Sequence, residues 1–139
     1  MENESEFYMK KNNSPVLSAN QWDEVAELYH KGIGIKGDKL HEKHIDPVIF
    51  EFLKGIKGAR VLDAGCGNGY LIPKLAPYAN SMVGIDYSKR LLTFAKEQAK
   101  PHKNVVLLHA NLLKKLPLAA DSFDVVIANM VLQYLPQLN

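Results

Sequence analysis

From residue 57 onward, short apolar runs alternate with segments whose apolar residues have helical spacing. Four apolar runs predict β-strands, at residues 59–63, 81–86, 104–109 and 123–129. Helical patterns at 70–76 and 88–99 separate the first three runs, and Ser88 is suited to cap the second helix. Strands that are apolar on both faces and alternate with helices indicate a parallel sheet covered by helices. The pattern therefore predicts an α/β fold.

The first part of the chain has a different pattern. Residues 1–20 are polar and mixed, and they predict a mobile or loosely docked leader. Helices are predicted at 21–29 and 38–54, and Pro47 marks a kink or a restart in the second one. We therefore divide the chain into an N-terminal leader with helices, 1–56, and a second part, 57–139.

Length and composition narrow the functional classes. The 139 residues suit one soluble domain with a buried core, since 47% are apolar and 23% are charged. A formal charge of +2 is too small to indicate a nucleic-acid partner. We find no signal-peptide pattern, and no apolar run approaches the roughly 18 residues that cross a bilayer. With a single cysteine, Cys66, these features predict a cytoplasmic protein with no membrane partner.

The most specific feature is a glycine-rich turn after the first predicted strand. Glycines at 65, 67 and 69 allow a tight reversal of the backbone and the close approach of a ligand. Asp86 ends the next strand, where it is placed to accept hydrogen bonds from ribose hydroxyls. A dinucleotide fingerprint has its third glycine where this chain has Tyr70. Asp63 adds an acid that suits a ligand with an ammonium group and no pyrophosphate, so a nicotinamide-dependent oxidoreductase is the weaker alternative.

Three segments in order resemble the motifs of class I S-adenosylmethionine-dependent methyltransferases. Val61–Gly69 is similar to their first motif, Gly84–Ser88 to their second-strand motif and Asp121–Asn129 to their fourth-strand segment. The resemblance implies a Rossmann-like, three-layer αβα fold with a mostly parallel sheet, preceded by N-terminal helices. It also implies S-adenosylmethionine as cofactor, S-adenosylhomocysteine as product and a small-molecule acceptor.

The resemblance further implies roles for individual residues. Asp63 would help to orient the cofactor's amino group, partly through water, and Asp86 would hold the ribose. Asn111 would hydrogen-bond the adenine amino group, with Tyr87 packing near the ring. The remaining cofactor-binding residues implied are Gly65, Cys66, Gly67, Asn68 and Gly69 in the turn, Leu112 beside Asn111, and Asn129 and Met130 at the sulfonium end. The residues alone leave simpler alternatives: Asp86 as a helix cap, Asn111 as an ordinary turn residue, and Tyr87 as plain surface.

Other candidate chemistry is weaker. Trp22 and Tyr29 either belong to a lid over the cofactor, as in similar enzymes, or pack against the domain. His41 and His44 have helical spacing but lack further ligands, so no metal site is expected. No catalytic residue is identified.

Similar enzymes have seven strands in the order 3-2-1-4-5-7-6, whereas this chain has four predicted strands. We therefore expect the C-terminal half of the usual fold to be absent. Its fourth strand would be an apolar, unpaired edge, so we expect self-association through it, for example as a dimer. The leading hypothesis is the cofactor-binding half of a methyltransferase. The alternative is a non-catalytic module that binds the cofactor or assembles with a partner.

Overall fold

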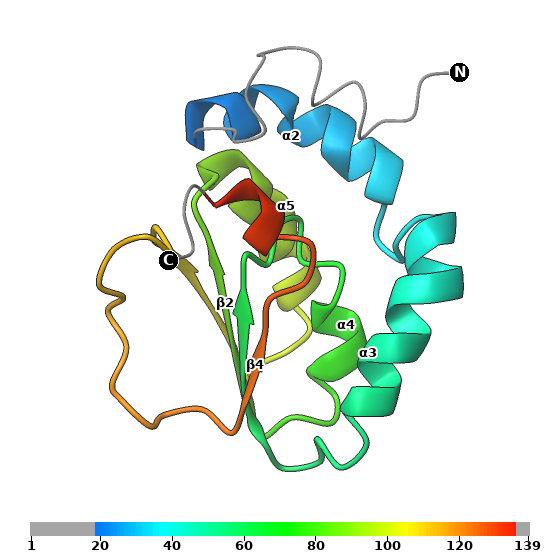
Figure 1. Cartoon of the computed structure of the whole chain (residues 1–139), viewed down its shortest axis with the longest axis vertical. Coiled ribbons are helices and arrows are strands. Elements are labelled where there is room, and N and C mark those ends of the chain that lie inside the picture. Colours follow the sequence, from blue (N-terminus) through cyan, green and yellow to red (C-terminus); the bar gives the residue numbers. More distant parts are fainter. Residues whose placement is uncertain (1–18, 136–139) are drawn as a thin grey trace.

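Four parallel strands form one sheet in the computed structural model, which describes residues 19–135 (Figure 1). The sheet has the order β3-β2-β1-β4, so β1 and β2 are central. The strands are β1 Arg60–Ala64, β2 Ser81–Asp86, β3 Val105–His109 and β4 Val125–Ile127. In the register, Asp63 pairs with Gly84 on one side and Ile127 on the other. Because all four strands are parallel, the loops that follow them meet at one end of the sheet.

Helices α2 to α5 contribute the core on one face of this sheet. Their bounds are α2 Ala19–Ile33, α3 Asp46–Phe52, α4 Ile72–Leu75 and α5 Lys89–Ala99. Apolar side chains from these helices, including Ile33 of α2 and Leu92 of α5, join Val61 and Met82 of the sheet in one cluster. Val61 and Met82 are fully buried, which explains why their strands are apolar on this face.

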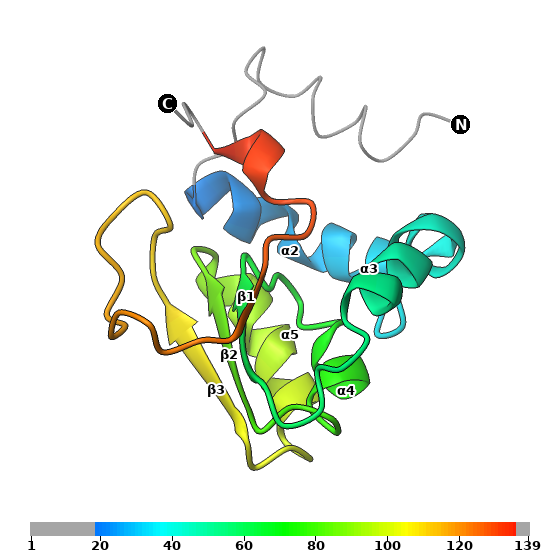
Figure 2. The ribbon, with the colours of Figure 1, turned by 60° about the horizontal axis from the view of Figure 1, so that its bottom comes forward.

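The opposite face of the sheet has a different cover. Leu62, Ala64 and Ile85 form a second cluster there with apolar residues of the connection between β3 and β4. This connection, residues 110–124, contains no helix and loops out away from α3 and α4 (Figures 1 and 2). The predicted fold class is confirmed, with one difference within the described part of the chain. An irregular segment forms the third layer where helices were expected.

The N-terminal helices follow the predicted pattern with two changes. Helix α2 continues to Ile33, beyond the predicted end, and stops where Gly34 adopts a φ of +68°. The second predicted helix divides into the π-helix η1, His41–Ile45, and α3, in whose first turn Pro47 lies. Pro47 thus marks a restart, because proline is compatible with a first helical turn. The predicted leader lies almost entirely outside the described residues.

Helix α2 is attached to the N-terminus of α5. Ser88 caps α5 by accepting the Leu91 N–H at 3.0 Å, as predicted. Asp23 of α2 accepts the Ser88 hydroxyl at 2.5 Å and the Arg90 N–H at 3.0 Å. Burial raises the pKa of Asp23, but these hydrogen bonds outweigh it and leave the pKa below its ordinary value.

Within residues 19–135, no helix is long and apolar enough to span a membrane.

Candidate functional site

A cavity of about 360 Å³ lies where the loops after the strands meet α2. Its volume is within the range of small-molecule and cofactor sites. Its walls come from α2, the glycine turn after β1, and the segments that follow β2, β3 and β4. The lining residues are Gln21, Trp22, Tyr29, Gly65, Gly67, Asp86, Tyr87, Leu91, Asn111, Leu112, Leu113, Asn129, Met130, Val131, Tyr134 and Leu135.

The glycine turn is shaped by contacts that require small residues. Gly65 has a φ of +81° and Gly67 a φ of +55°. The N–H groups of Gly65 and Cys66 both donate to the Ile85 carbonyl at 2.8 Å, which fixes the turn to β2. A methyl group on Gly65 would lie 2.5 Å from Val131 Cγ2, so the backbone must be bare there. Gly65 and Gly67 nevertheless line the cavity, so the turn remains accessible to a ligand.

Asp86 lies at the cavity wall and is bound to the turn. Its carboxylate accepts the Gly67 N–H at 2.8 Å through one oxygen and the Ser88 N–H at 2.8 Å through the other. Burial raises the pKa of Asp86, although both backbone hydrogen bonds oppose that shift. The helix-capping alternative is therefore incomplete, because Asp86 also joins β2 to the glycine turn and faces the cavity.

Asp63 lies behind the turn and is not among the lining residues. Its exposed fraction is 2%, and burial together with the charge of Asp86 raises its pKa to about 7. A carboxyl with this pKa changes its charge easily in response to a nearby cation. Cys66 is also buried behind the turn, next to Gly84, and burial raises the pKa of its thiol, so it fills a small space there and does not line the cavity.

The structure places Asn68 and Gly69 away from the cavity. Asn68 is 1% exposed, and its Nδ2 donates to the Gly34 carbonyl at 2.9 Å and lies 3.1 Å from His30 Nδ1. It therefore connects the turn to α2 and its C-terminal loop and does not line the cavity, so its predicted contact with the cofactor stays a prediction. Gly69 packs against α5, where a methyl group would lie 2.9 Å from Ala95 Cα.

The other predicted residues line the cavity. Asn111 uses its side-chain oxygen to accept the Leu113 N–H at 2.9 Å, so it is a turn residue as well as a wall residue. Tyr87 is 45% exposed and stacks on His109, with ring centroids 6.2 Å apart. Asn129 donates to the Tyr70 hydroxyl at 2.8 Å. The remaining two, Leu112 and Met130, also line the cavity.

Sequence reasoning missed the apolar wall that follows β4. Val131, Tyr134 and Leu135 line the cavity in and around the 3₁₀ helix η2, Leu132–Tyr134. Trp22 connects this wall to α2 through edge-to-face contacts with Tyr134 at 5.1 Å and Tyr29 at 5.8 Å. Trp22 and Tyr29 thus both pack against the domain and line the cavity. No short motif predicts Tyr134 as a wall residue. The only signal in the sequence is an aromatic residue in the segment after a predicted strand.

The electrostatic character of the cavity is acidic. Among its described lining residues, Asp86 is the only one with a formal charge at neutral pH. Such a wall favours a neutral or cationic ligand over an anionic one. His41 lies elsewhere, with its Nδ1 2.7 Å from Asp38, and residues 19–135 hold no cluster of three or more potential metal ligands.

Comparisons with known proteins agree with this geometry. Residues 56–139 match the family described as "Methyltransferase domain". A ubiquinone biosynthesis O-methyltransferase of Coxiella burnetii is 30% identical over 95 residues, which are 66% of this chain and 41% of that protein. A malonyl-[acyl-carrier protein] O-methyltransferase of Legionella pneumophila is 36% identical over 98 residues, 67% of this chain and 34% of that protein. The chain therefore spans less than half the length of these relatives.

A solved structure shows the same fold. Magnesium protoporphyrin IX methyltransferase from Synechocystis, with bound S-adenosylmethionine, aligns with a TM-score of 0.67 at 21% sequence identity. The alignment covers 88% of this chain and 67% of that chain, so it includes part of the N-terminal region as well as the sheet.

Proposed function

Because this chain belongs to the family of methyltransferase domains, we propose that it binds S-adenosylmethionine in the cavity between the glycine turn and α2. The observation that carries this proposal is the position of Asp86, at the end of β2, bonded to Gly67 and facing the cavity. A carboxylate there accepts ribose hydroxyls, and the bare backbone of Gly67 leaves room for the rest of the nucleoside. The acidic wall also suits a ligand with a positively charged sulfur.

Individual residues then take the roles that the family resemblance implies. Asp86 holds the ribose, and Tyr87, Asn111 and Leu112 surround the adenine. Gly65 and Gly67 lie beneath the methionine part, with the Asp63 carboxylate behind them. Asn129 and Met130 flank the sulfonium end.

The proposed reaction is methyl transfer to a small-molecule acceptor. When bound, S-adenosylmethionine would supply a methyl group attached to a positively charged sulfur. An acceptor atom would attack the methyl carbon in line with the carbon–sulfur bond, and S-adenosylhomocysteine would be the leaving group. The protein's part is alignment and exclusion of water, and ideal alignment contributes up to about 7–11 kcal/mol. A small acceptor is supported by the two relatives, which carry the names of O-methyltransferases of small or carrier-bound metabolites. In this proposal the described residues supply the cofactor-binding half of the methyltransferase. We also propose that the protein is cytoplasmic and has no nucleic-acid partner.

Calorimetric titration tests the binding claim directly. We expect S-adenosylhomocysteine to bind the folded chain with one-to-one stoichiometry and NAD to give no heat. Folded protein that binds NAD and not S-adenosylhomocysteine would contradict the proposal and favour the nicotinamide-dependent oxidoreductase. Binding without transfer across a panel of acceptors would favour the non-catalytic module.

Cofactor affinity should increase with pH around neutrality. Asp63 has a pKa of about 7, so it is mostly protonated at pH 6 and mostly ionised at pH 8. The cofactor's ammonium group stabilises the ionised form, so binding lowers this pKa and releases a proton. Between pH 6 and 8 we expect a tighter dissociation constant for S-adenosylhomocysteine, with a limiting slope of about tenfold per pH unit below the pKa.

Titrations in buffers with different ionisation heats measure the released proton. The matched variant is Asp63→Asn, which cannot ionise and should remove the pH dependence. An unchanged slope in this variant would assign the effect to another group, Asp86 being the nearest candidate because its pKa is also raised.

We also propose that the chain self-associates through β4. Among the described strands, β4 pairs only with β1, and Val126 at its centre is 62% exposed. An exposed apolar edge strand readily pairs with another chain. We expect sedimentation velocity to show a dimer that dissociates on dilution, and Val126→Lys to give a monomer.

The opposite edge of the sheet provides the control. Val106 of β3 is 55% exposed and also lies at an edge of the sheet, so Val106→Lys introduces the same charge at a comparable site. A dimer that persists in this variant and is lost in Val126→Lys pairs through β4 rather than β3. A wild-type chain that stays monomeric over the whole dilution series would contradict self-association.

A further inference from the structure

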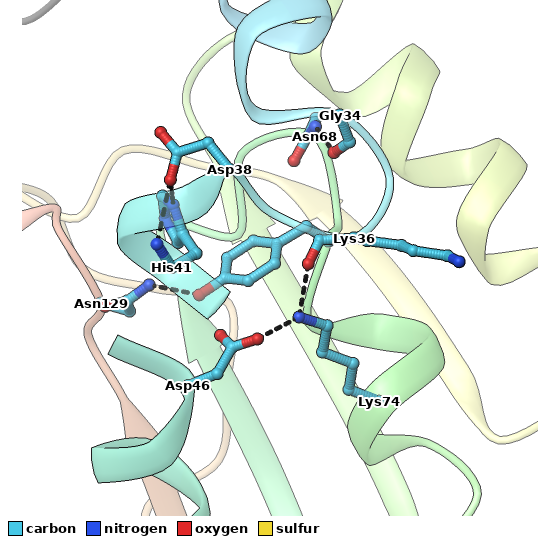
Figure 3. Close-up of polar contacts among 9 residues, drawn as sticks. Gly34, Lys36, Asp38, His41, Asp46, Asn68, Lys74 and Asn129 are labelled. Carbon is cyan, nitrogen blue, oxygen red and sulfur yellow. Dashed lines mark hydrogen bonds and ion pairs between the residues drawn. The ribbon is translucent and has the colours of Figure 1, made fainter. Parts of the chain in front are cut away.

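Tyr70 connects the glycine turn to the segment after β4. It follows Gly69 directly, is 5% exposed and does not line the cavity. Its hydroxyl oxygen accepts a hydrogen bond from Nδ2 of Asn129 at 2.8 Å (Figure 3). Asn129 does line the cavity, so Tyr70 contacts the site through one side chain.

The Tyr70 ring is held on two sides by N-terminal residues and by α4. The His41 ring meets it edge to face at 4.7 Å, and Asp38 fixes that imidazole through Nδ1 at 2.7 Å. The Lys74 ammonium lies 4.9 Å from the ring centroid.

Lys74 is itself held in place. It donates to Asp46 and, at 2.7 Å, to the Lys36 carbonyl, so segment 36–46 and α4 are joined around the ring (Figure 3). A ring that is restrained in this way holds its hydroxyl in one position.

The hydrogen bond from Asn129 Nδ2 to this fixed hydroxyl holds the Asn129 amide in one orientation. A carboxamide has two ends of opposite polarity, an NH₂ donor and a carbonyl acceptor. With the NH₂ end bonded to Tyr70, the carbonyl oxygen is the end left for other partners. We propose that Tyr70 is a positioning residue, which orients the Asn129 amide so that its carbonyl oxygen serves the sulfonium end of the cofactor. This inference rests on the proposed function, which places Asn129 at that end.

The electrostatic consequence separates the methyl donor from the product. A carbonyl oxygen is attracted to the positive charge of the sulfonium in S-adenosylmethionine. S-adenosylhomocysteine has a neutral sulfur and gains little from the same contact. Loss of the orienting hydrogen bond should therefore weaken binding of the donor more than binding of the product.

Tyr70→Phe tests this difference because it removes the hydroxyl and keeps the ring contacts with His41 and Lys74. We expect S-adenosylmethionine to bind about three- to tenfold more weakly, as for loss of one hydrogen bond, and S-adenosylhomocysteine to change less than about twofold. Tyr78→Phe is the matched control, since Tyr78 is 61% exposed and should alter neither affinity.

A double-mutant cycle separates positioning from a general structural role. If Tyr70 acts through Asn129, Tyr70→Phe should have no further effect on donor affinity in an Asn129→Ala background. Equal loss of donor and product affinity, or full additivity in the cycle, would overturn the inference. Wild-type protein that binds neither ligand would instead reject the proposed function.

Asn129→Leu provides a test that does not depend on the folding of the Tyr70 variant. It removes both polar ends of the amide at a half-buried position. The ratio of donor to product affinity should fall by the same three- to tenfold, about that of one hydrogen bond. An unchanged ratio in folded Asn129→Leu protein would overturn the inference by itself.

Discussion

Asp86→Ala should lower the affinity for S-adenosylhomocysteine by about 100-fold or more. Each hydrogen bond to a charged group contributes about 1.5–3 kcal/mol, and the carboxylate is proposed to accept two from the ribose. The variant also removes the bond to the Gly67 N–H, so the glycine turn loses one of its links to the end of β2 and keeps those to the Ile85 carbonyl. Titration calorimetry of variant and wild type measures the ratio of dissociation constants.

Glu97→Gln is the control for removal of an acidic charge. Glu97 is exposed on α5, where it pairs with Lys100 at 2.7 Å. It does not line the cavity, so its replacement should leave affinity within about twofold, as expected for an exposed pair. An Asp86→Ala protein that is folded and binds the ligand with near wild-type affinity would be incompatible with the ribose contact.

Gly69→Ala should lower the free energy of unfolding by about 2–5 kcal/mol. The left-handed φ of +80° costs an alanine about 1–2 kcal/mol. The new methyl group would also lie 2.9 Å from both Ala95 Cα and Ile72 Cδ1, and overpacking of this kind adds about 1–3 kcal/mol. Ala95 Cα is a backbone atom of α5, so the clash cannot be relieved by a rotamer change alone.

Gly58→Ala introduces the backbone strain alone, so its comparison with Gly69→Ala isolates the packing contribution. Gly58 has nearly the same φ, +79°, but a methyl group there meets nothing within 4 Å. Denaturant unfolding should therefore show a loss of about 1–2 kcal/mol in this variant, from backbone strain alone. If the free energy of unfolding falls by the same amount in both variants, the close packing of the turn on α5 does not contribute to stability.

The sheet was predictable because its strands are covered on both faces and hence continuously apolar. β1, β2 and β3 begin and end within one residue of the predicted runs. β4 is shorter, Val125–Ile127, for two local reasons. The Arg60 N–H donates to the Asp124 carboxylate at 2.8 Å instead of to a strand carbonyl, and Met130 adopts a φ of +54° as the chain turns into the cavity wall.

The helix after the glycine turn was less predictable. The apolar pattern extends over 70–76, whereas α4 covers only Ile72–Leu75. Tyr70 is apolar in the pattern but belongs to the end of the turn, where its hydroxyl reaches Asn129. Periodicity cannot distinguish a side chain that packs in a helix from one that makes a contact 59 positions away.

Within the site, the residues found from sequence are those whose backbone conformation is local. Gly65, Gly67 and Asp86 are defined by a turn and a strand end, and both features are visible in a short motif. Asn68 has the same local signal, but tertiary contacts with His30 and Gly34 determine where its side chain points. Val131 and Tyr134 join the wall because the chain folds back over the turn, which no spacing rule describes.

The core shared between α2, α3 and the sheet has a consequence for where the protein can be divided. The match to the methyltransferase-domain family begins at residue 56, yet Ile33, Ile49 and Leu53 pack in the same apolar cluster as β1 and β2. A fragment cut at residue 56 would leave one side of that cluster open to water. The segment that the family model matches is therefore smaller than the segment that shares this core.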